Sequence, residues 1–440
     1  QRLSISKQCY CHCYASGLAG WFCITGDRDA LEAAIDSVEH NYDSQKRGKK
    51  KEPGKSNVFS RDFTRSCYLT AAVRLAAPTN KFVIEASDFL KDVYVKRPAP
   101  ELRGLVKPPS PVDAGTIKKM TAGKGAAKMK ELGVKLEGGF LVDKDGHKWH
   151  PVLSPHTWMF TYQAGALECY YRSTGDEDAM DHCIAYGQAV DHVLWQPKHG
   201  NLSYGSFIVD FPVRGHAEDP ASWQLPEGSK LGKGVKINGY LACFHPDIPG
   251  RAYSLTGEKF LKQRAYDYWW GGSHRGYNKT EMHALGGIGT GINVNGLHSE
   301  SVITTARTFY EWSHPRKDGE APAAVKDLNV VVNGEAATVT FTAPADAGGG
   351  RVTRYQVKCS DREIADYDAF LKIYNEFKEK EHCNWFLARN VAGEPAPQAP
   401  GAKESFTVTG VPAGAKFFAV RAFDEASNRS AISNVGVGAP

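Results

Sequence analysis

One stretch, residues 268–283 (YWWGGSHRGYNKTEMH), gathers four aromatic residues, two histidines, one arginine and one glutamate, with glycines between them. Trp269 and Trp270 offer flat faces on which sugar rings stack, and Arg275 offers a guanidinium that pairs with a carboxylate. His274 is a proton-transfer group near neutral pH. The alternative interpretation is structural. In that case the two tryptophans belong to a core, and His274 caps a helix that the glycines bring to an end.

A second group of polar and aromatic residues lies in the segment 196–236, which is rich in Gly, Pro and His. Loops this long inside a compact domain are usually functional. The segment offers carboxylates for a hydrolase, which needs one acid and one base or nucleophile. Asp62 and Glu281 are alternative carboxylates, and no spacing marks a pair. The candidates within the segment are Tyr204, Asp210, Arg214, His216, Glu218 and Asp219.

Helices must position these residues, because three segments repeat one pattern of helix, tight turn and helix. The segments start at Tyr14, Tyr162 and Tyr240, and each has Thr-Gly-Asp or Thr-Gly-Glu at its turn. The glycine suits a left-handed helix C-cap, and the acid after it suits the N-terminus of the next helix. A fourth hairpin, residues 61–94, turns at Pro78 to Asn80 instead. The repeated turn residues are Gly26 and Asp27, Gly175 and Asp176, and Gly257 and Glu258.

The faces of these helices predict two layers. In the second helix of the first hairpin, Leu31, Ala34, Ile35 and Val38 form one apolar stripe. The first helix of each pair carries small and aromatic residues on most sides, so we expect it to be buried all round. We therefore expect an inner ring of buried helices inside an outer ring of amphipathic helices. Residues at the starts of successive first helices would then meet at one mouth.

After Asp318 the pattern changes to alternating strands with a turn about every ten residues, which predicts a β-sandwich. An insertion, residues 364–402, interrupts the strands with an expected helix at DYDAFLKIYNEFKEK. The end of the chain resembles a fibronectin type III domain, an immunoglobulin-like fold. The resemblance implies a spacer or an adhesive module. It is carried by Tyr355, Val357, Phe406, Val408, Gly410, Pro412 and the strand FFAVRAFD with the following NRSAISN.

Residues 1–317 resemble the α/α-toroid superfamily of carbohydrate-active enzymes, on the hairpin turns given above. That superfamily includes polysaccharide lyases and uronic-acid hydrolases. The resemblance implies an α/α-toroid domain over 1–317, followed by the fibronectin type III-like domain over 318–440. Fewer hairpins are recognised than a complete ring needs. We therefore expect either further helices in the long excursions or a second polypeptide that completes the toroid.

The same resemblance implies roles for the residues at the mouth. A lyase needs one group that neutralises the uronate carboxylate and another that takes the acidic C5 proton. By resemblance to toroid lyases, His274 or Tyr277 is the expected base, and Asn278 with Arg275 neutralises the carboxylate. The expected sugar-contacting residues are Trp269, Trp270, His156, Trp158, Tyr162, Arg61, Arg65, His12, Tyr204 and His216, with Tyr14 and Asp62 beside them.

Composition limits the classes of partner. The 440 residues contain no run of ~20 apolar residues that would span a membrane. The lysine-rich segments 46–55 and 118–130 carry much of the net charge of +5. They can attract a polyanion such as an acidic polysaccharide or an anionic membrane, and the alternative is a solvated lysine surface without a partner. No nucleic-acid motif accompanies this charge, so we expect no nucleic-acid partner. The chain starts at Gln1, which we interpret as the processed N-terminus of a secreted protein, extracellular or periplasmic.

The cysteines do not form a recognisable metal site. Residues 9–13 (CYCHC) hold a C-x-C-x-C pattern, and no C-x-x-C occurs in the chain. We expect small buried thiols there. Cys359 and Cys383 flank the insertion and would be able to pair in an oxidising compartment. We expect no cofactor and no metal ligands, and the sequence leaves a structural calcium ion open.

The sequence therefore predicts an exported bacterial protein that cleaves an acidic polysaccharide by β-elimination. A glycoside hydrolase on the same scaffold is one alternative. The other is a non-catalytic extracellular scaffold, an adhesin or a subunit of a larger assembly. Ultraviolet absorbance of the product separates the first two, since only β-elimination leaves an unsaturated uronate.

Overall fold

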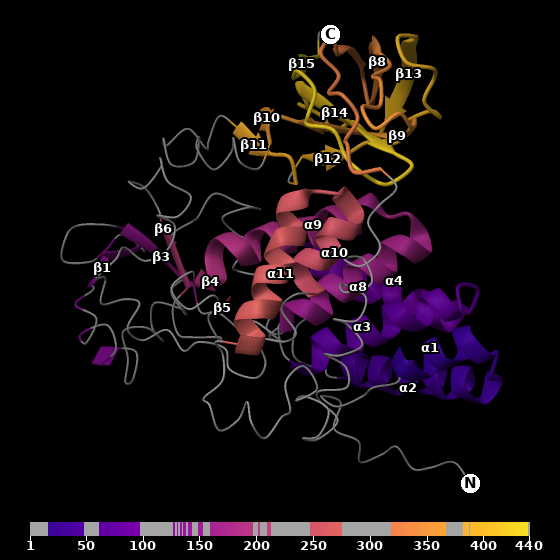
Figure 1. Ribbon diagram of the computed structural model, residues 1–440, viewed down its shortest axis with the longest axis vertical. Coiled ribbons are helices and arrows are strands. Elements are labelled where there is room, and N and C mark those ends of the chain that lie inside the picture. Colours follow the sequence, from indigo (N-terminus) through magenta and orange to yellow (C-terminus); the bar gives the residue numbers. More distant parts are fainter. Residues whose placement is uncertain are drawn as a thin grey trace.

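The computed structural model describes residues 16–47, 61–96, 159–196, 247–274, 318–366, 382–386 and 388–438, with short pieces between 126 and 152 and between 201 and 212. The described helices lie in the first part of the chain, and most of the described strands lie in the last part (Figure 1). None of these helices is long and apolar enough to cross a membrane.

Eight helices can be delimited in the described residues, and they form four hairpins. This confirms the predicted repeat, including the fourth hairpin that turns at Pro78 to Asn80. The helices are α1 (Ser16–Thr25), α2 (Arg28–Arg47), α3 (Arg61–Ala76), α4 (Lys81–Lys96), α8 (Met159–Thr174), α9 (Glu177–Leu194), α10 (Asp247–Thr256) and α11 (Lys259–His274).

The three Thr-Gly-acid turns share one construction. Their glycines have positive φ angles of 76°, 75° and 71°, as a left-handed C-cap requires. In each turn the threonine hydroxyl accepts a hydrogen bond from the backbone N–H of the acid, at 3.1–3.2 Å. Asp27 and Asp176 then accept backbone N–H groups of the next helix, which confirms them as N-caps.

Helices α3, α8 and α10 are the first helices of three hairpins and run parallel to one another. Side chains near the starts of α3 and α8 meet (Arg65 with Tyr162), and so do side chains near their ends (Arg74 with Tyr170). On the other side, Glu168 of α8 bonds to α10. The described residues show no closed ring of helices.

The approach of α3 to α8 depends on Gly165. A Cβ atom at this position would lie 2.8 Å from two ring carbons of Tyr68. The Tyr68 ring has little room to move, since it lies between Tyr162 and Arg251. The two helix backbones can therefore come this close only with glycine here.

We predict that Gly165→Ala lowers the free energy of unfolding by about 1–3 kcal/mol, because the added methyl overpacks a full interface. Gly20→Ala in α1 is the matched control, since no atom lies within 4 Å of its added Cβ. Removing a helical glycine there should stabilise by about 0.5–1 kcal/mol. Urea denaturation of both variants measures the difference. Equal effects of the two substitutions would contradict the close contact.

The prediction that every first helix is buried all round is correct for most of α8 but wrong for α1. Leu18, Trp21 and Ile24 of α1 are 38%, 53% and 82% exposed. Among described elements α1 contacts α2 and α3, so only its Ala19 side is covered. The predicted stripe of α2 is confirmed, because Ala34 and Val38 are fully buried.

Two small sheets accompany the helices. In the first sheet, β2 (Phe140–Val142) and β3 (Lys148–Val152) pair antiparallel. β6 (Val209–Pro212), which lies in the segment 196–236, pairs antiparallel with β3 at the edge of this sheet. The structure adds β1 (Lys135–Glu137) beside β2, and the short pair β4 (Trp195–Gln196) and β5 (Asn201–Leu202).

The last part of the chain consists of two antiparallel sheets that pack face to face, as predicted. Side chains of both sheets form one core, in which the rings of Phe341 and Tyr355 lie 5.0 Å apart. One sheet has the order β13 (Lys403–Thr409), β8 (Ala336–Thr342), β7 (Asn329–Asn333). The other has the order β12 (Arg389–Asn390), β9 (Val352–Ser360), β14 (Phe417–Asp424), β15 (Gly436–Val437).

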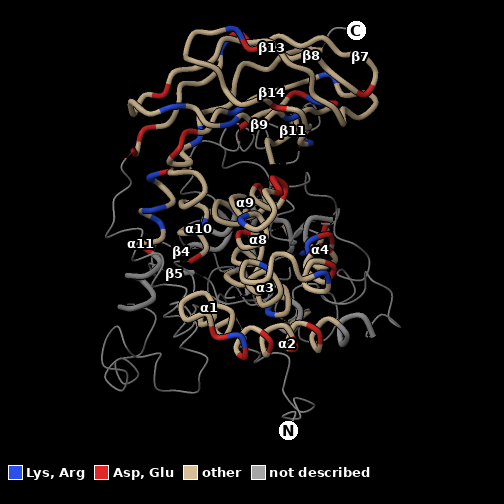
Figure 2. The backbone as a smooth tube through the Cα atoms, turned by 90° about the vertical axis from the view of Figure 1, so that its right-hand side faces the viewer, with Lys and Arg blue, Asp and Glu red and all other residues tan. Residues whose placement is uncertain are grey.

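This β-region sits on one end of the helical region, above α9 and α10 (Figures 1 and 2). A single hydrophobic cluster runs through both regions and joins Met180 and Ile184 of α9 to Trp385 and Phe423. The insertion contributes to it through β10 (Glu363–Ala365) and β11 (His382–Asn384), which pair parallel. The predicted helix of the insertion and the domain boundary at 317–318 lie outside the described residues.

Candidate functional site

The structure brings two of the predicted sugar-contacting residues together. Arg65 near the start of α3 donates a hydrogen bond from Nη2 to the Tyr162 hydroxyl of α8, at 3.0 Å. Its guanidinium carbon also lies 4.9 Å from the centre of the Tyr162 ring. Both side chains are buried, with exposures of 2% and 1%. A guanidinium held by a phenol is a fixed, forked donor for a carboxylate.

A second charged cluster lies farther along the same helices. Arg251 of α10 donates to Glu168 and to Asp247, each at 2.5 Å, and Arg172 donates to Glu168 at 2.8 Å. Burial lowers the pKa of the Arg251 guanidinium, but Asp247 and Glu168 outweigh it and raise that pKa well above its ordinary value. Two carboxylates therefore balance two guanidinium groups. The cluster braces α8 against α10 and leaves neither carboxylate free to act as an acid or base.

Gln163, next to Tyr162 on α8, is completely buried. Neither the oxygen nor the nitrogen of its amide has a hydrogen-bond partner among the described residues. A buried polar group without a partner costs about 1–3 kcal/mol. The start of α8 thus combines the Arg65–Tyr162 pair with an unsatisfied buried amide.

The opening stretch, residues 268–283, begins as helix and not as loop. Helix α11 continues through Trp269, Trp270 and two glycines to His274, its last residue. This backbone agrees with the helix-end interpretation for the first half of the stretch. The side chains of Trp269, Trp270 and His274 lie outside the described part, so their predicted roles stay predictions.

Most other candidates cannot be placed. Arg61 and Asp62 belong to the first turn of α3, and Asp210 belongs to β6, all three with backbone positions only. The remaining candidates lie outside the described residues and stay predictions. They are His12, Tyr14, His156, Trp158, Tyr204, Arg214, His216, Glu218, Asp219, Arg275, Tyr277, Asn278 and Glu281.

Sequence reasoning missed a polar network between the helices and the β-region. Lys358 of β9 bonds to Asp181 of α9 at 2.7 Å, and both side chains are buried, with exposures of 1% and 2%. Gln356 and Asn390 donate to the same carboxylate oxygen, at 3.0 and 3.2 Å. The Lys358 ammonium also donates to the backbone oxygen of Trp385. The network joins the first turns of α9 to β9 and β12.

Glu177 stands at the rim of this network, 2.8 Å from Arg354. Burial raises the pKa of its carboxyl from 4.5 to about 7, although the charge of Arg354 pulls it down. The folded chain therefore holds this proton at pH values where the unfolded chain has lost it. The stabilisation is complete below pH 4.5 and disappears as the pH rises to about 7.

We predict that Glu177→Gln removes this dependence. Between pH 4.5 and 7 the wild-type chain should lose up to about 1.4 kcal/mol of stability per pH unit relative to the variant. Urea denaturation of both proteins at several pH values measures the difference. Parallel stability profiles for the two proteins would mean that Glu177 does not titrate in this range.

The cysteines and carboxylates offer no catalytic metal centre near α3 and α8 within the described part. Cys359 and Cys383 are buried and free, so the predicted pairing is not formed in this structure. Burial raises the pKa of Cys359 to about 11, and that of Cys383 above its ordinary value, which makes both poor nucleophiles. One described group of carboxylates is close enough to hold a metal ion, and it belongs to the β-region.

Two signals would have found part of what was missed. Glu168 with Arg172 and Asp247 with Arg251 have the i, i+4 spacing of helical ion pairs, which is visible in the sequence. The contact of Arg251 with Glu168, 83 residues apart, has no such signal. The same is true of Lys358 and Asp181.

Comparison with models of known protein families gives no match, and no curated protein matches this sequence.

Proposed function

We propose that this chain is a glycan-active protein built on an α/α toroid, and that it cleaves an acidic polysaccharide by β-elimination. The observation that carries the proposal is the Arg65–Tyr162 pair. It joins the starts of two parallel helices that are the first members of their hairpins. In a toroid such positions converge on the mouth that binds the glycan.

The fold supports this proposal at a coarse level. Four hairpins follow one another, and α3, α8 and α10 are parallel, as the inner helices of an α/α toroid are. The strand orders β13-β8-β7 and β12-β9-β14-β15 agree with a fibronectin type III-like sandwich. Exposed Trp21 and Ile24 on α1 leave one side of the helix array uncovered, which suits the proposal that a second polypeptide completes the ring.

In the proposed reaction Arg65 pairs with the uronate carboxylate, together with Asn278 and Arg275, the neutralising residues that the resemblance implies. This pairing stabilises the charge that develops when the C5 proton leaves. Tyr162 is a positioning residue that orients the guanidinium.

The proton goes to His274 or Tyr277, the base that the resemblance implies. The electron pair of the C5–H bond forms the new double bond between C4 and C5. The C4–O bond breaks, and the glycosidic oxygen leaves with the electron pair of that bond and takes up a proton, which the base returns or water supplies.

The hydrolase alternative has less support from the described side chains, which do not include those of its candidates Asp62, Asp210, Glu218, Asp219 and Glu281. It needs two carboxylates in acid and base roles, and the buried Glu168 and Asp247 are already bonded to Arg251. Full burial of Arg65 and Tyr162 favours the other alternative, a non-catalytic scaffold in which the pair only fastens α3 to α8. A lyase gives an unsaturated product, a hydrolase gives a saturated product, and a scaffold gives no product.

The test is a panel of acidic polysaccharides, followed by ultraviolet absorbance and by a reducing-end assay in parallel. The proposal predicts that both signals rise together on at least one polysaccharide. New reducing ends without absorbance would identify a hydrolase. The absence of both signals across the panel would reject the enzyme and favour the scaffold.

A further inference from the structure

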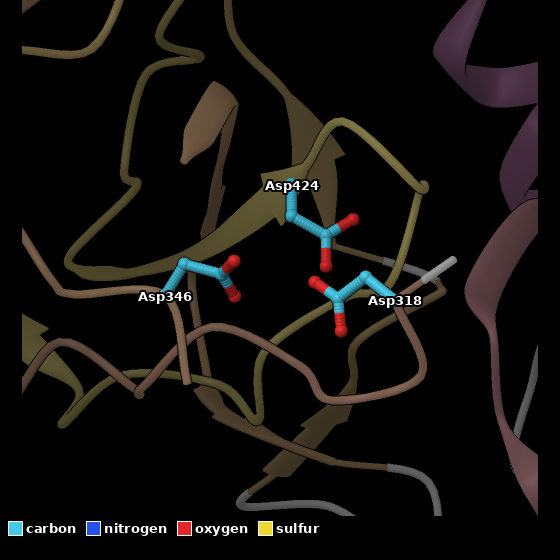
Figure 3. Close-up of side chains that lie close together, drawn as sticks. All are labelled: Asp318, Asp346 and Asp424. Carbon is cyan, nitrogen blue, oxygen red and sulfur yellow. The ribbon is translucent and has the colours of Figure 1, made fainter. Parts of the chain in front are cut away.

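Three aspartates from separate segments of the β-region turn their carboxylates toward one another (Figure 3). Asp318 precedes the first strand, Asp346 lies in the loop between β8 and β9, and Asp424 ends β14. One carboxylate oxygen of each can be chosen so that all three atoms lie within 4.8 Å of one another. The segments are far apart in sequence, so the fold itself assembles this group.

Two oxygens of this group are left without a donor. Asp318 Oδ2 and Asp346 Oδ1 are buried and have no hydrogen-bond partner. Their sister oxygens are used, since Asp318 Oδ1 accepts the N–H of Glu320 and Asp346 Oδ2 accepts that of Gly350, both at 2.8 Å. No lysine or arginine of the described part forms an ion pair with any of the three aspartates.

Asp424 is held in a fixed position. Its exposure is 2%, and its carboxylate accepts the backbone N–H groups of Ala426 and Asn428 and the Asn428 side-chain amide. Asp318 and Asp346 are half-buried beside the buried Asp424, so three negative charges this close together repel one another. A cation would remove this repulsion.

We propose that Asp318, Asp346 and Asp424 bind a divalent cation of the calcium type. An all-oxygen carboxylate set is what hard cations prefer, whereas zinc prefers nitrogen and sulfur ligands. Calcium–oxygen distances of about 2.3–2.6 Å allow ligand oxygens on opposite sides of the ion to lie about 5 Å apart. The three carboxylate oxygens lie within 4.8 Å of one another, which is compatible with one ion between them.

The position of the site gives the ion a structural role. Asn428 donates to the backbone oxygens of Asp318 and Glu320 and so ties the first residues of the β-region to the turn after β14. Next to it, Arg429 bonds to Glu258 between α10 and α11, at 2.5 Å. An ion between the three aspartates would fasten this junction of helices and sandwich.

The test is titration of the metal-free chain with calcium chloride, by calorimetry and by thermal unfolding. We expect one saturable site and a melting temperature that rises by several degrees. Asp346→Asn keeps an oxygen for Gly350 but removes one charge, so it should abolish binding. In EDTA the same variant should melt above the wild-type chain, because it relieves the repulsion. Asp361→Asn, an exposed carboxylate of the same region, is the control and should bind as the wild-type chain does.

Two results would overturn the proposal. One is a wild-type chain that shows neither heat of binding nor a shift in melting temperature with calcium chloride. The other is an Asp346→Asn variant that is folded by circular dichroism and binds calcium as tightly as the wild-type chain. The wild-type titration does not depend on the folding of any variant. It also does not depend on whether the chain cleaves a glycan.

Discussion

Lys358→Met is expected to lower the free energy of unfolding by about 3–5 kcal/mol, the cost of leaving one member of a buried ion pair without its partner. Asp181 would keep its charge inside the junction, 2% exposed, with only the amides of Gln356 and Asn390 to satisfy it. Methionine fills a similar volume, so the loss comes from the charge and not from a cavity. Urea denaturation of the whole chain measures it.

Lys403→Met is the matched control. Lys403 pairs with Asp327 at 3.1 Å, with nearly the same geometry, but the two side chains are 75% and 45% exposed. Exposed pairs contribute about 0–1 kcal/mol, so this variant should be almost as stable as the wild-type chain. The double variant Lys358→Met with Asp181→Leu removes both charges and should recover most of the loss. Similar losses for Lys358→Met and Lys403→Met would refute the role of burial.

Arg65→Met is expected to lower kcat/KM by at least ~100-fold on the polysaccharide that the wild-type chain cleaves, the usual cost of removing one preorganised donor. The reason is the proposed pairing of Arg65 with the uronate carboxylate. Arg65→Lys keeps the charge but loses the planar fork, so it should recover only part of the activity. Initial rates of absorbance change, measured over a range of polysaccharide concentrations, give both constants.

Arg74→Met provides a control between the same two helices. Arg74 lies 4.9 Å from the ring of Tyr170, the distance at which Arg65 lies from the ring of Tyr162. It stands at the other end of α3, where it bonds to Ser87 and Asp88. This variant should be less stable but should keep its kcat/KM. Equal losses of activity in the two variants would show that Arg65 acts only through the packing of α3 on α8.

The helical hairpins could be predicted because their signals are local. A Thr-Gly-acid turn needs a residue with positive φ and an N-cap within a few positions, and Gly26, Gly175 and Gly257 mark those places directly. The stripe of α2 also depends only on helical spacing. Helical spacing does not reveal which other elements pack against each helix. The exposed side of α1 was therefore predicted as buried.

The strands of the β-region could be predicted for the same reason, but the burial of their polar face could not. Along β9, Tyr355 and Val357 point into the sandwich core, while Gln356 and Lys358 point the other way. Alternation of this kind is typical of a strand with one face in water. Here that face is buried under α9, because the partner acid, Asp181, comes from a helix far away in sequence.

The candidate site shows the same limit. Arg65 and Tyr162 were chosen because each stands near the start of a predicted first helix, and the structure brings them within 3.0 Å. The contact of Glu168 with Arg251 and the group of carboxylates around Asp424 could be identified only from the folded structure. Carboxylates from Asp318, Asp346 and Asp424 meet only when the two sheets are assembled, and no short motif contains them.

The measurement that tests the central claim most directly compares one acidic polysaccharide with the same polymer after its carboxyl groups are reduced to alcohols. β-Elimination needs the carboxylate to make the C5 proton acidic, whereas hydrolysis of the glycosidic bond does not. We predict absorbance and new reducing ends from the native polymer and neither from the reduced polymer. Reducing ends released from both polymers, or no product from any native acidic polysaccharide, would contradict the proposed function.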